Sequence, residues 1–169
     1  MEDRRARFEQ IYRQHAGAVA AYALRRAPRE TAEEVVAETF LVAWRRLDGV
    51  PEQSLPWLYG VARRMLANQR RSTARRAALT QRLKLQAAVA ALDSVDECLV
   101  DALQALQTHD REVLMLVAWE GLTSTEAAQA LGCSPVACRI RLHRARKRLA
   151  RAMDSPPNSA ADLATTEAK

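Results

Sequence analysis

The feature that most constrains the fold lies near the carboxyl end, where a short capped helix, a glycine turn and a longer basic helix follow one another. Thr123 and Glu126 have the spacing of a capping box, in which each side chain satisfies a free backbone N–H group of a new helix. Gly132 can end that helix, Ser134 can cap the next one, and Pro135 suits its first turn. This order of elements is typical of a helix-turn-helix.

The second helix of this motif, expected from 135 to about 152, has two different faces. Its apolar stripe has 4, 3, 4 spacing and consists of Cys138, Leu142, Ala145 and Leu149. A basic helix alone is usually only a solvated surface, but the capping box, turn and phased stripe together favour insertion in the DNA major groove. The predicted contacts are Arg139, Ile140, His143, Arg144 and Lys147, with Arg141, Arg146 and Arg148 at the margins, where phosphate contacts are more natural.

The remaining sequence also favours helices. Glycine occurs only 5 times, aromatic residues make up 5% of the chain, and apolar residues recur at helical spacing. We expect an all-α protein of two small helical domains joined by a linker, and a Thr31–Glu34 capping box at the start of the second helix. The expected parts are a three-helix domain over 5–72, a linker over 73–95, a helix-turn-helix domain over 96–153 and a disordered tail over 154–169.

The positive charges are unevenly distributed, although the net charge is only +6. No acidic residue lies between Glu52 and Asp93, and a second acid-free stretch follows Glu126; both stretches are rich in arginine. Two separate cationic surfaces are therefore expected, and their natural partner is a polyanion such as nucleic acid.

Several classes of protein are disfavoured. The chain has no apolar stretch of 18 residues and no secretion signal at its start, so we expect a cytoplasmic protein without membrane insertion. Its three cysteines are too few for a disulfide framework. We expect no zinc, because helical spacing turns Cys138 and His143 to opposite faces, and no cofactor. No nucleophile–base pair, carboxylate pair or phosphate-binding loop is visible, so we do not expect an enzyme.

Three segments, in order, resemble the bacterial RNA polymerase sigma factors of the sigma-70 family, extracytoplasmic-function (ECF) group. AEEVVAETFLVAWRRL, Ala32 to Leu47, is similar to the segment that binds the clamp of the largest polymerase subunit. WLYGVARRMLANQRR, Trp57 to Arg71, resembles the helix that engages the minus-ten promoter element. Leu122 to Leu149 is similar to the helix-turn-helix that reads the minus-thirty-five element.

The resemblance implies that the first domain binds core polymerase and opens DNA at the minus-ten element. The residues expected to bind the clamp are Glu38 and the exposed parts of Val35, Thr39 and Val42, although the apolar members could simply pack inside the bundle. The residues expected at the minus-ten element are Trp57, Arg63, Arg64, Asn68 and Arg71. Trp57 could stack on an unpaired base or belong to the core.

The same resemblance implies further partners: promoter DNA, the flap of the second-largest polymerase subunit and an anti-sigma factor. Transcription initiation at a stress- or signal-responsive regulon is the function implied. The alternative is a stand-alone helix-turn-helix regulator whose N-terminal bundle serves for dimerisation or sensing. Such a regulator binds duplex operators without polymerase, whereas a sigma factor generally needs the core enzyme.

Overall fold

The computed structural model describes residues 2–76 and 97–154, and within these ranges the secondary structure is helical throughout. This confirms the all-α prediction. Most of the predicted linker and tail, residues 77–95 and 155–169, lie outside the described residues. The first group of elements comprises α1 (Glu2–Leu24), α2 (Arg29–Arg45), the short 3-10 helix η1 (Leu47–Gly49) and α3 (Ser54–Arg76). The second comprises α4 (Glu97–Ala105), α5 (Thr108–Ala118), α6 (Ser124–Leu131) and α7 (Pro135–Asp154).

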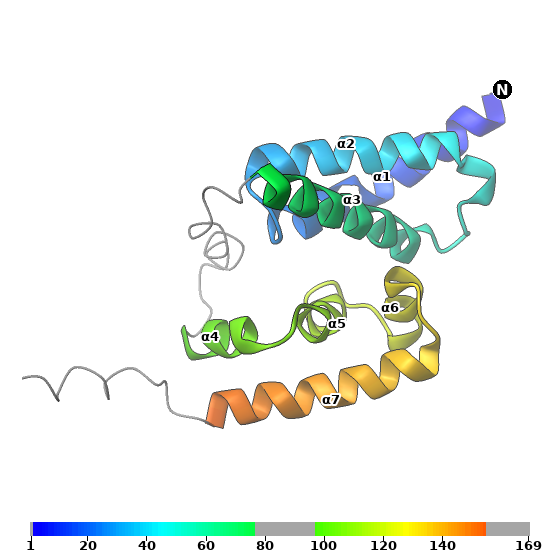
Figure 1. Ribbon diagram of the computed structural model, residues 1–169. Coiled ribbons are helices and arrows are strands. Elements are labelled where there is room, and N and C mark those ends of the chain that lie inside the picture. Colours follow the sequence, from blue (N-terminus) through cyan, green and yellow to red (C-terminus); the bar gives the residue numbers. More distant parts are fainter. Residues whose placement is uncertain (1, 77–96, 155–169) are drawn as a thin grey trace, which may run out of the picture.

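Helices α1, α2 and α3 form the first bundle, and their apolar stripes meet in its core (Figure 1). Val19, Val35 and Leu58, one from each helix, are completely buried. Aromatic rings extend this core toward the surface, where Phe40 makes edge contacts with Phe8 and Tyr12 of α1. Burial of these stripes is the main source of stability for helices of this length.

The predicted capping box at the start of α2 is wrong. The helix already begins at Arg29, and Pro28 occupies the capping position without any side-chain hydrogen bond to the first turn. Proline fixes its own φ near the helical value, so the helix can begin directly after it, and Thr31 falls inside the first turn. Glu34 instead accepts a hydrogen bond from Gln69 Nε2 of α3, at 3.1 Å.

The second bundle contains the helix-turn-helix as predicted. The Thr123–Glu126 capping box is present at the start of α6, and Gly132 ends that helix in the left-handed conformation, with φ of 69°. Ser134 Oγ then accepts a hydrogen bond from the backbone N–H of Ala137, 3.2 Å away, in the first turn of α7. These local signals were readable from the sequence because each acts within four residues.

The two bundles pack directly against each other, with α6 lying along α3 (Figure 1). Ion pairs also cross this contact, from Arg25 and Arg26 of the first bundle to Glu112 and Glu120 of the second. The sequence predicted two domains joined by a linker but did not predict this contact between them. Contacts between residues distant in the chain leave no local pattern in the sequence.

Candidate nucleic-acid interface

Helix α7 has one buried and one exposed face, as its apolar stripe predicted. Cys138, Leu142 and Ala145 are buried, whereas the side chains predicted to contact bases, Arg139, Ile140, His143, Arg144 and Lys147, are exposed. Ile140 is 49% exposed, so its side chain is accessible for contact with a thymine methyl group. Cys138 and His143 lie on opposite faces, as expected.

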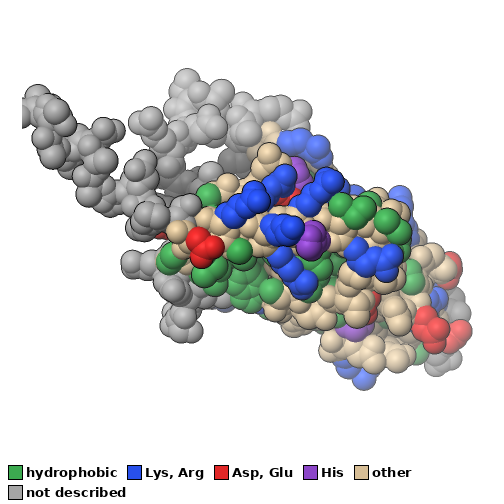
Figure 2. Space-filling view, turned by 90° about the horizontal axis from the view of Figure 1, so that it is seen from below, with side chains coloured by type: hydrophobic (Ala, Val, Ile, Leu, Met, Phe, Trp, Pro, Cys, Tyr) green, Lys and Arg blue, Asp and Glu red, His purple; other side chains and the backbone are tan. Residues whose placement is uncertain are grey.

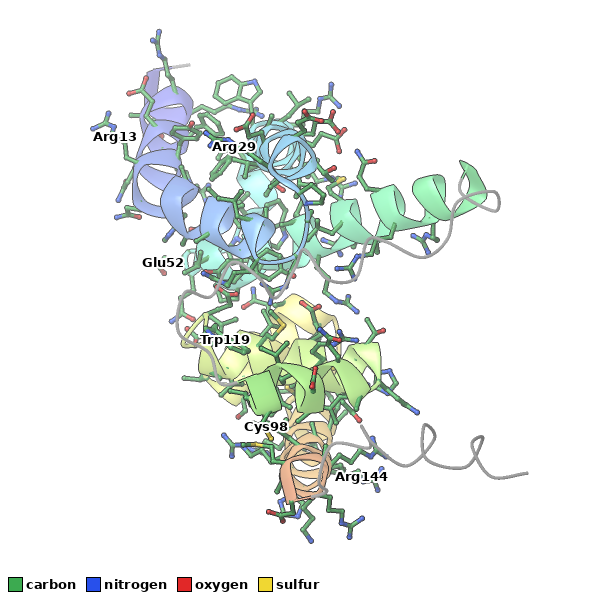
Figure 3. All side chains as sticks on the ribbon, turned by 90° about the vertical axis from the view of Figure 1, so that its left-hand side faces the viewer. Arg13, Arg29, Glu52, Cys98, Trp119 and Arg144 are labelled. Atoms are coloured by element: carbon green, nitrogen blue, oxygen red, sulfur yellow. The ribbon has the colours of Figure 1, made fainter. Side chains whose placement is uncertain are left out.

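Positive charge gathers on the surface formed by α7. Seen from the α7 side, Figure 2 shows a cluster of Lys and Arg side chains over this helix. Figure 3 shows Arg144 at the end of the molecule away from α1 and α2. Arg146 is exposed beside it, and Arg141 is half-buried. This face can therefore approach DNA while the first bundle stays attached to the opposite side of the domain.

Arg148, at the margin of this face, forms an ion pair that was not predicted from the sequence. The Arg148 guanidinium pairs with the carboxylate of Asp110, which is only 2% exposed, and so joins α7 to the start of α5. Gln107 and His109 of the same α5 region line an open hollow together with Arg144. Asp110 occupies a stripe position, three residues before Val113 and four after Leu106, and that position could have predicted its burial.

Helix α3 carries the second candidate surface. Arg64, Asn68 and Arg71 are exposed at i, i+4 and i+7, so they share one face, and Arg71 donates to Asn68 Oδ1 at 2.6 Å. The other two residues predicted for the minus-ten element differ from these. Arg63 is half-buried, and Trp57 is half-buried and packed against the core. The structure therefore gathers three of the five predicted residues on an open face.

Two of the four residues predicted to bind core polymerase are not on the surface. Val35 and Thr39 are completely buried, and Thr39 Oγ1 donates to the Val35 carbonyl at 2.6 Å within α2. The prediction that they have exposed parts is wrong, because the buried stripe of α2 includes both. Glu38 is exposed and Val42 half-buried. Leu41, 46% exposed beside them, was not predicted to have any role.

Trp44 of α2 is a further exposed apolar side chain. It is 39% exposed and lies at the edge of the bundle, where Phe8 makes an edge contact with its ring and Arg4 lies over it at 5.5 Å.

In the parts of the chain that the structure describes, no helix is long and apolar enough to cross a membrane, and no group of three or more potential metal ligands occurs.

Comparison with known proteins finds one family match for each helical bundle. The family described as Sigma-70 region 2 matches residues 11–76, and Sigma-70, region 4 matches residues 96–149. The ECF RNA polymerase sigma factor SigL of Mycobacterium tuberculosis is 30% identical over 145 residues, which cover 79% of this chain and 81% of SigL. The "Probable RNA polymerase sigma factor RfaY" of Xanthomonas campestris pv. campestris is 35% identical over 127 residues, covering 68% of this chain but only 32% of RfaY.

A solved structure gives the same architecture. The sigma factor RpoE of Bartonella quintana, crystallised in complex with the anti-sigma factor NepR, is 25% identical in sequence and superposes with a TM-score of 0.66. The match covers 87% of this chain and 96% of RpoE. The similarity therefore includes both helical bundles.

The Arg148–Asp110 pair leads to a prediction about stability. Arg148→Ala leaves the buried Asp110 carboxylate without its cationic partner, so we expect the free energy of unfolding to fall by about 1–3 kcal/mol. Arg146→Ala is the matched control, because this neighbouring arginine is exposed, and it should change stability by less than about 0.5 kcal/mol. Urea denaturation followed by circular dichroism measures both. Equal stability of the two variants would contradict a structural role for Arg148.

Proposed function

The chain belongs to the extracytoplasmic-function sigma factors of the sigma-70 family, and from this premise we propose how its surfaces divide the work of promoter selection. Sigma factors direct RNA polymerase to promoters. In our proposal the second bundle reads the minus-thirty-five element, and the first bundle engages the minus-ten element and core polymerase. The domain boundaries that we propose are those expected from the sequence, 5–72 and 96–153.

The observation that carries the proposal is the exposed polar face of α7 opposite its buried stripe. Arg139, His143 and Arg144 are exposed along this face, and arginine can donate two hydrogen bonds to the O6 and N7 atoms of guanine. Ile140 provides apolar contact. Arg141, Arg146 and Lys147 are proposed to contact the phosphate backbone or bases beside them, since phosphate contacts fix the orientation of a recognition helix.

Helix α3 is proposed to hold DNA at the minus-ten element. Arg64 and Arg71 share an exposed face with Asn68, and such a face can follow the phosphate backbone of the melted strand. Trp57, in the first turn of α3, is partly exposed, which is compatible with stacking on an unpaired base. Arg63, half-buried nearby, is proposed to strengthen the positive potential there.

The exposed side of α2 is proposed to bind the clamp of the largest polymerase subunit. Glu38 offers a charge and Val42 a partly accessible apolar surface, and we add the exposed Leu41 to this set. The flap of the second-largest subunit is the proposed partner of the helix-turn-helix domain. The similarity to RpoE, whose structure contains NepR, supports an anti-sigma factor as a further partner of this chain.

A stand-alone regulator is the competing function, and dependence on core polymerase distinguishes the two. We expect the chain to bind promoter DNA tightly only when core enzyme is added, and to direct transcription from fragments that share two separated motifs. In vitro transcription of a genomic fragment library, followed by gel-shift assays of the recovered promoters with and without core enzyme, measures both. Tight binding of duplex DNA by the chain alone, without any transcript, would contradict the proposal.

Arg144 gives a prediction about base choice. Arg144→Ala should weaken promoter binding by the assembled polymerase by about 1–3 kcal/mol and relax the sequence preference at one minus-thirty-five position, because a base contact is lost. Arg146→Ala is the control and should weaken binding about equally on all sequences, as loss of a phosphate contact does. Affinities for a promoter library randomised at that element provide the measurement. A uniform loss with Arg144→Ala would assign this side chain to the backbone.

A further inference from the structure

The beginning of α7 presents an apolar tip to the solvent. Val136 and Ile140 are 55% and 49% exposed, and they lie one turn apart on the same face of the helix. Pro135 and Ala137, on either side of Val136 in the chain, are exposed as well and have no hydrogen-bonding side chain. The only hydroxyl group nearby, on Ser134, accepts a hydrogen bond from the Ala137 backbone N–H group. The first turn of α7 therefore offers a partner apolar surface and no polar side chain that reaches outward.

This apolar tip, Val136 and Ile140, points away from the core of the second bundle. Successive residues of an α-helix are rotated by about 100°, because one turn contains 3.6 residues. Counted from the buried Cys138, Leu142 and Ala145, the two residues of the tip fall on the opposite side of the helix axis. A recognition helix contacts base edges through its amino-terminal residues. The tip is therefore the part of α7 that reaches the floor of the major groove first.

Positive side chains surround the apolar tip and point to DNA as its partner. Arg139 and Arg144 are exposed on either side of Ile140, and Lys147 is exposed two turns further along the same face. The first acidic residue of α7 is Asp154, the last residue of the helix. Figure 2 accordingly shows hydrophobic side chains among the Lys and Arg side chains on this side of the molecule. An apolar surface ringed by cations suits a polyanion that also carries apolar groups.

The major groove contains one such apolar group, the methyl group at C5 of thymine. The other groups on the base edges are hydrogen-bond donors and acceptors. An aliphatic side chain pressed against a cytosine amino group leaves that donor without a partner, which costs free energy. Contact with a methyl group instead removes apolar surface from water, which is favourable. Because 5-methylcytosine carries its methyl group at the same ring position as thymine, an aliphatic side chain reads both bases alike.

We propose that the apolar tip of α7 recognises a pair of C5 methyl groups on pyrimidines of the minus-thirty-five element. This inference rests on the proposed function of α7 and names the chemical feature that the helix reads. It makes Val136, which was not predicted to contact DNA, a specificity-determining residue beside Ile140. The two residues lie about 6 Å apart along the helix axis, and base pairs are stacked about 3.4 Å apart. The two methyl groups therefore belong to pyrimidines no more than two base pairs apart, on either strand.

The proposal has a consequence for modified DNA. A cytosine at either position lacks the methyl group and is disfavoured, whereas 5-methylcytosine restores it. Methylation of cytosine within the element therefore strengthens promoter binding by this chain.

Removal of single methyl groups from promoter DNA tests the proposal with the wild-type chain bound to core polymerase. The probe is a promoter recovered by transcription of the genomic fragment library, in which each thymine of the minus-thirty-five element is replaced in turn by deoxyuridine. This base lacks only the C5 methyl group. At two positions we expect the affinity to fall about fourfold, as for the loss of one buried carbon. At the same positions, 5-methylcytosine paired with guanine should bind about fourfold more tightly than cytosine paired with guanine.

Truncation of the tip connects each methyl group to one side chain. Val136→Ala and Ile140→Ala shorten exposed side chains without changing the charge or the buried stripe, so far-UV circular dichroism should match wild type. Each variant should lose the methyl effect at one of the two positions and keep it at the other, as in a double-mutant cycle. Met153→Ala is the matched control, because Met153 is 41% exposed at the other end of α7, and it should retain both methyl effects.

The outcomes separate this inference from the proposed function. Unchanged affinity after every deoxyuridine substitution, with normal transcription from the unmodified promoter, would overturn the inference alone. Methyl effects that persist in both Val136→Ala and Ile140→Ala would also overturn it, because other side chains would then make the contacts. Impaired assembly of these variants with core enzyme, together with intact methyl effects, would assign the tip to polymerase instead of DNA. Absence of any transcript from the library would reject the proposed function and this inference together.

Discussion

The arrangement of this molecule depends on the buried pairing of Arg26 with Glu120, which joins the turn after α1 to the segment after α5. Within each bundle, burial of the apolar stripes holds the helices together, and this hydrophobic effect is not directional. Between the bundles, buried side chains of both belong to one hydrophobic core, and charges that are costly to leave unpaired add to this contact. The close approach of Gly60 to α6 requires the same alignment. Polar contacts thus add directional pairing to apolar burial that is continuous across the two bundles.

Helix α3 takes part in the first bundle, in the contact with the second bundle and in the proposed DNA surface. One face of the helix packs in its own bundle, another is covered by α6, and a third carries the exposed Arg64, Asn68 and Arg71. The recognition face of α7 lies away from this contact and remains exposed in the same form. In this arrangement both proposed DNA surfaces are therefore exposed, and the packing of the bundles sets the distance between them.

The sequence predicted what depends on near neighbours. The phase of α7 followed from its stripe, and the caps at Thr123 and Ser134 followed from residue types with local hydrogen-bonding roles. Val35 and Thr39 were wrongly predicted to reach the surface. A resemblance to a family can assign a whole helix to a partner, but it does not say which side chains of that helix face the partner and which face the core. Thr31 was misread as a cap because Pro28 starts the helix earlier. Arg26 and Glu120 lie far apart in the chain and outside the helices, just after α1 and α5, so helical periodicity could not predict their contact.

The direct packing of the two bundles through α3 and α6 is the central feature of this structure. Spin labels on noncanonical amino acids at the exposed positions Ala67 of α3 and Gln129 of α6 allow the distance between the bundles to be measured by pulsed electron paramagnetic resonance. We expect a short, narrow distance distribution in the free chain, because α3 and α6 are in contact. A long or broad distribution in the free chain would contradict this packing.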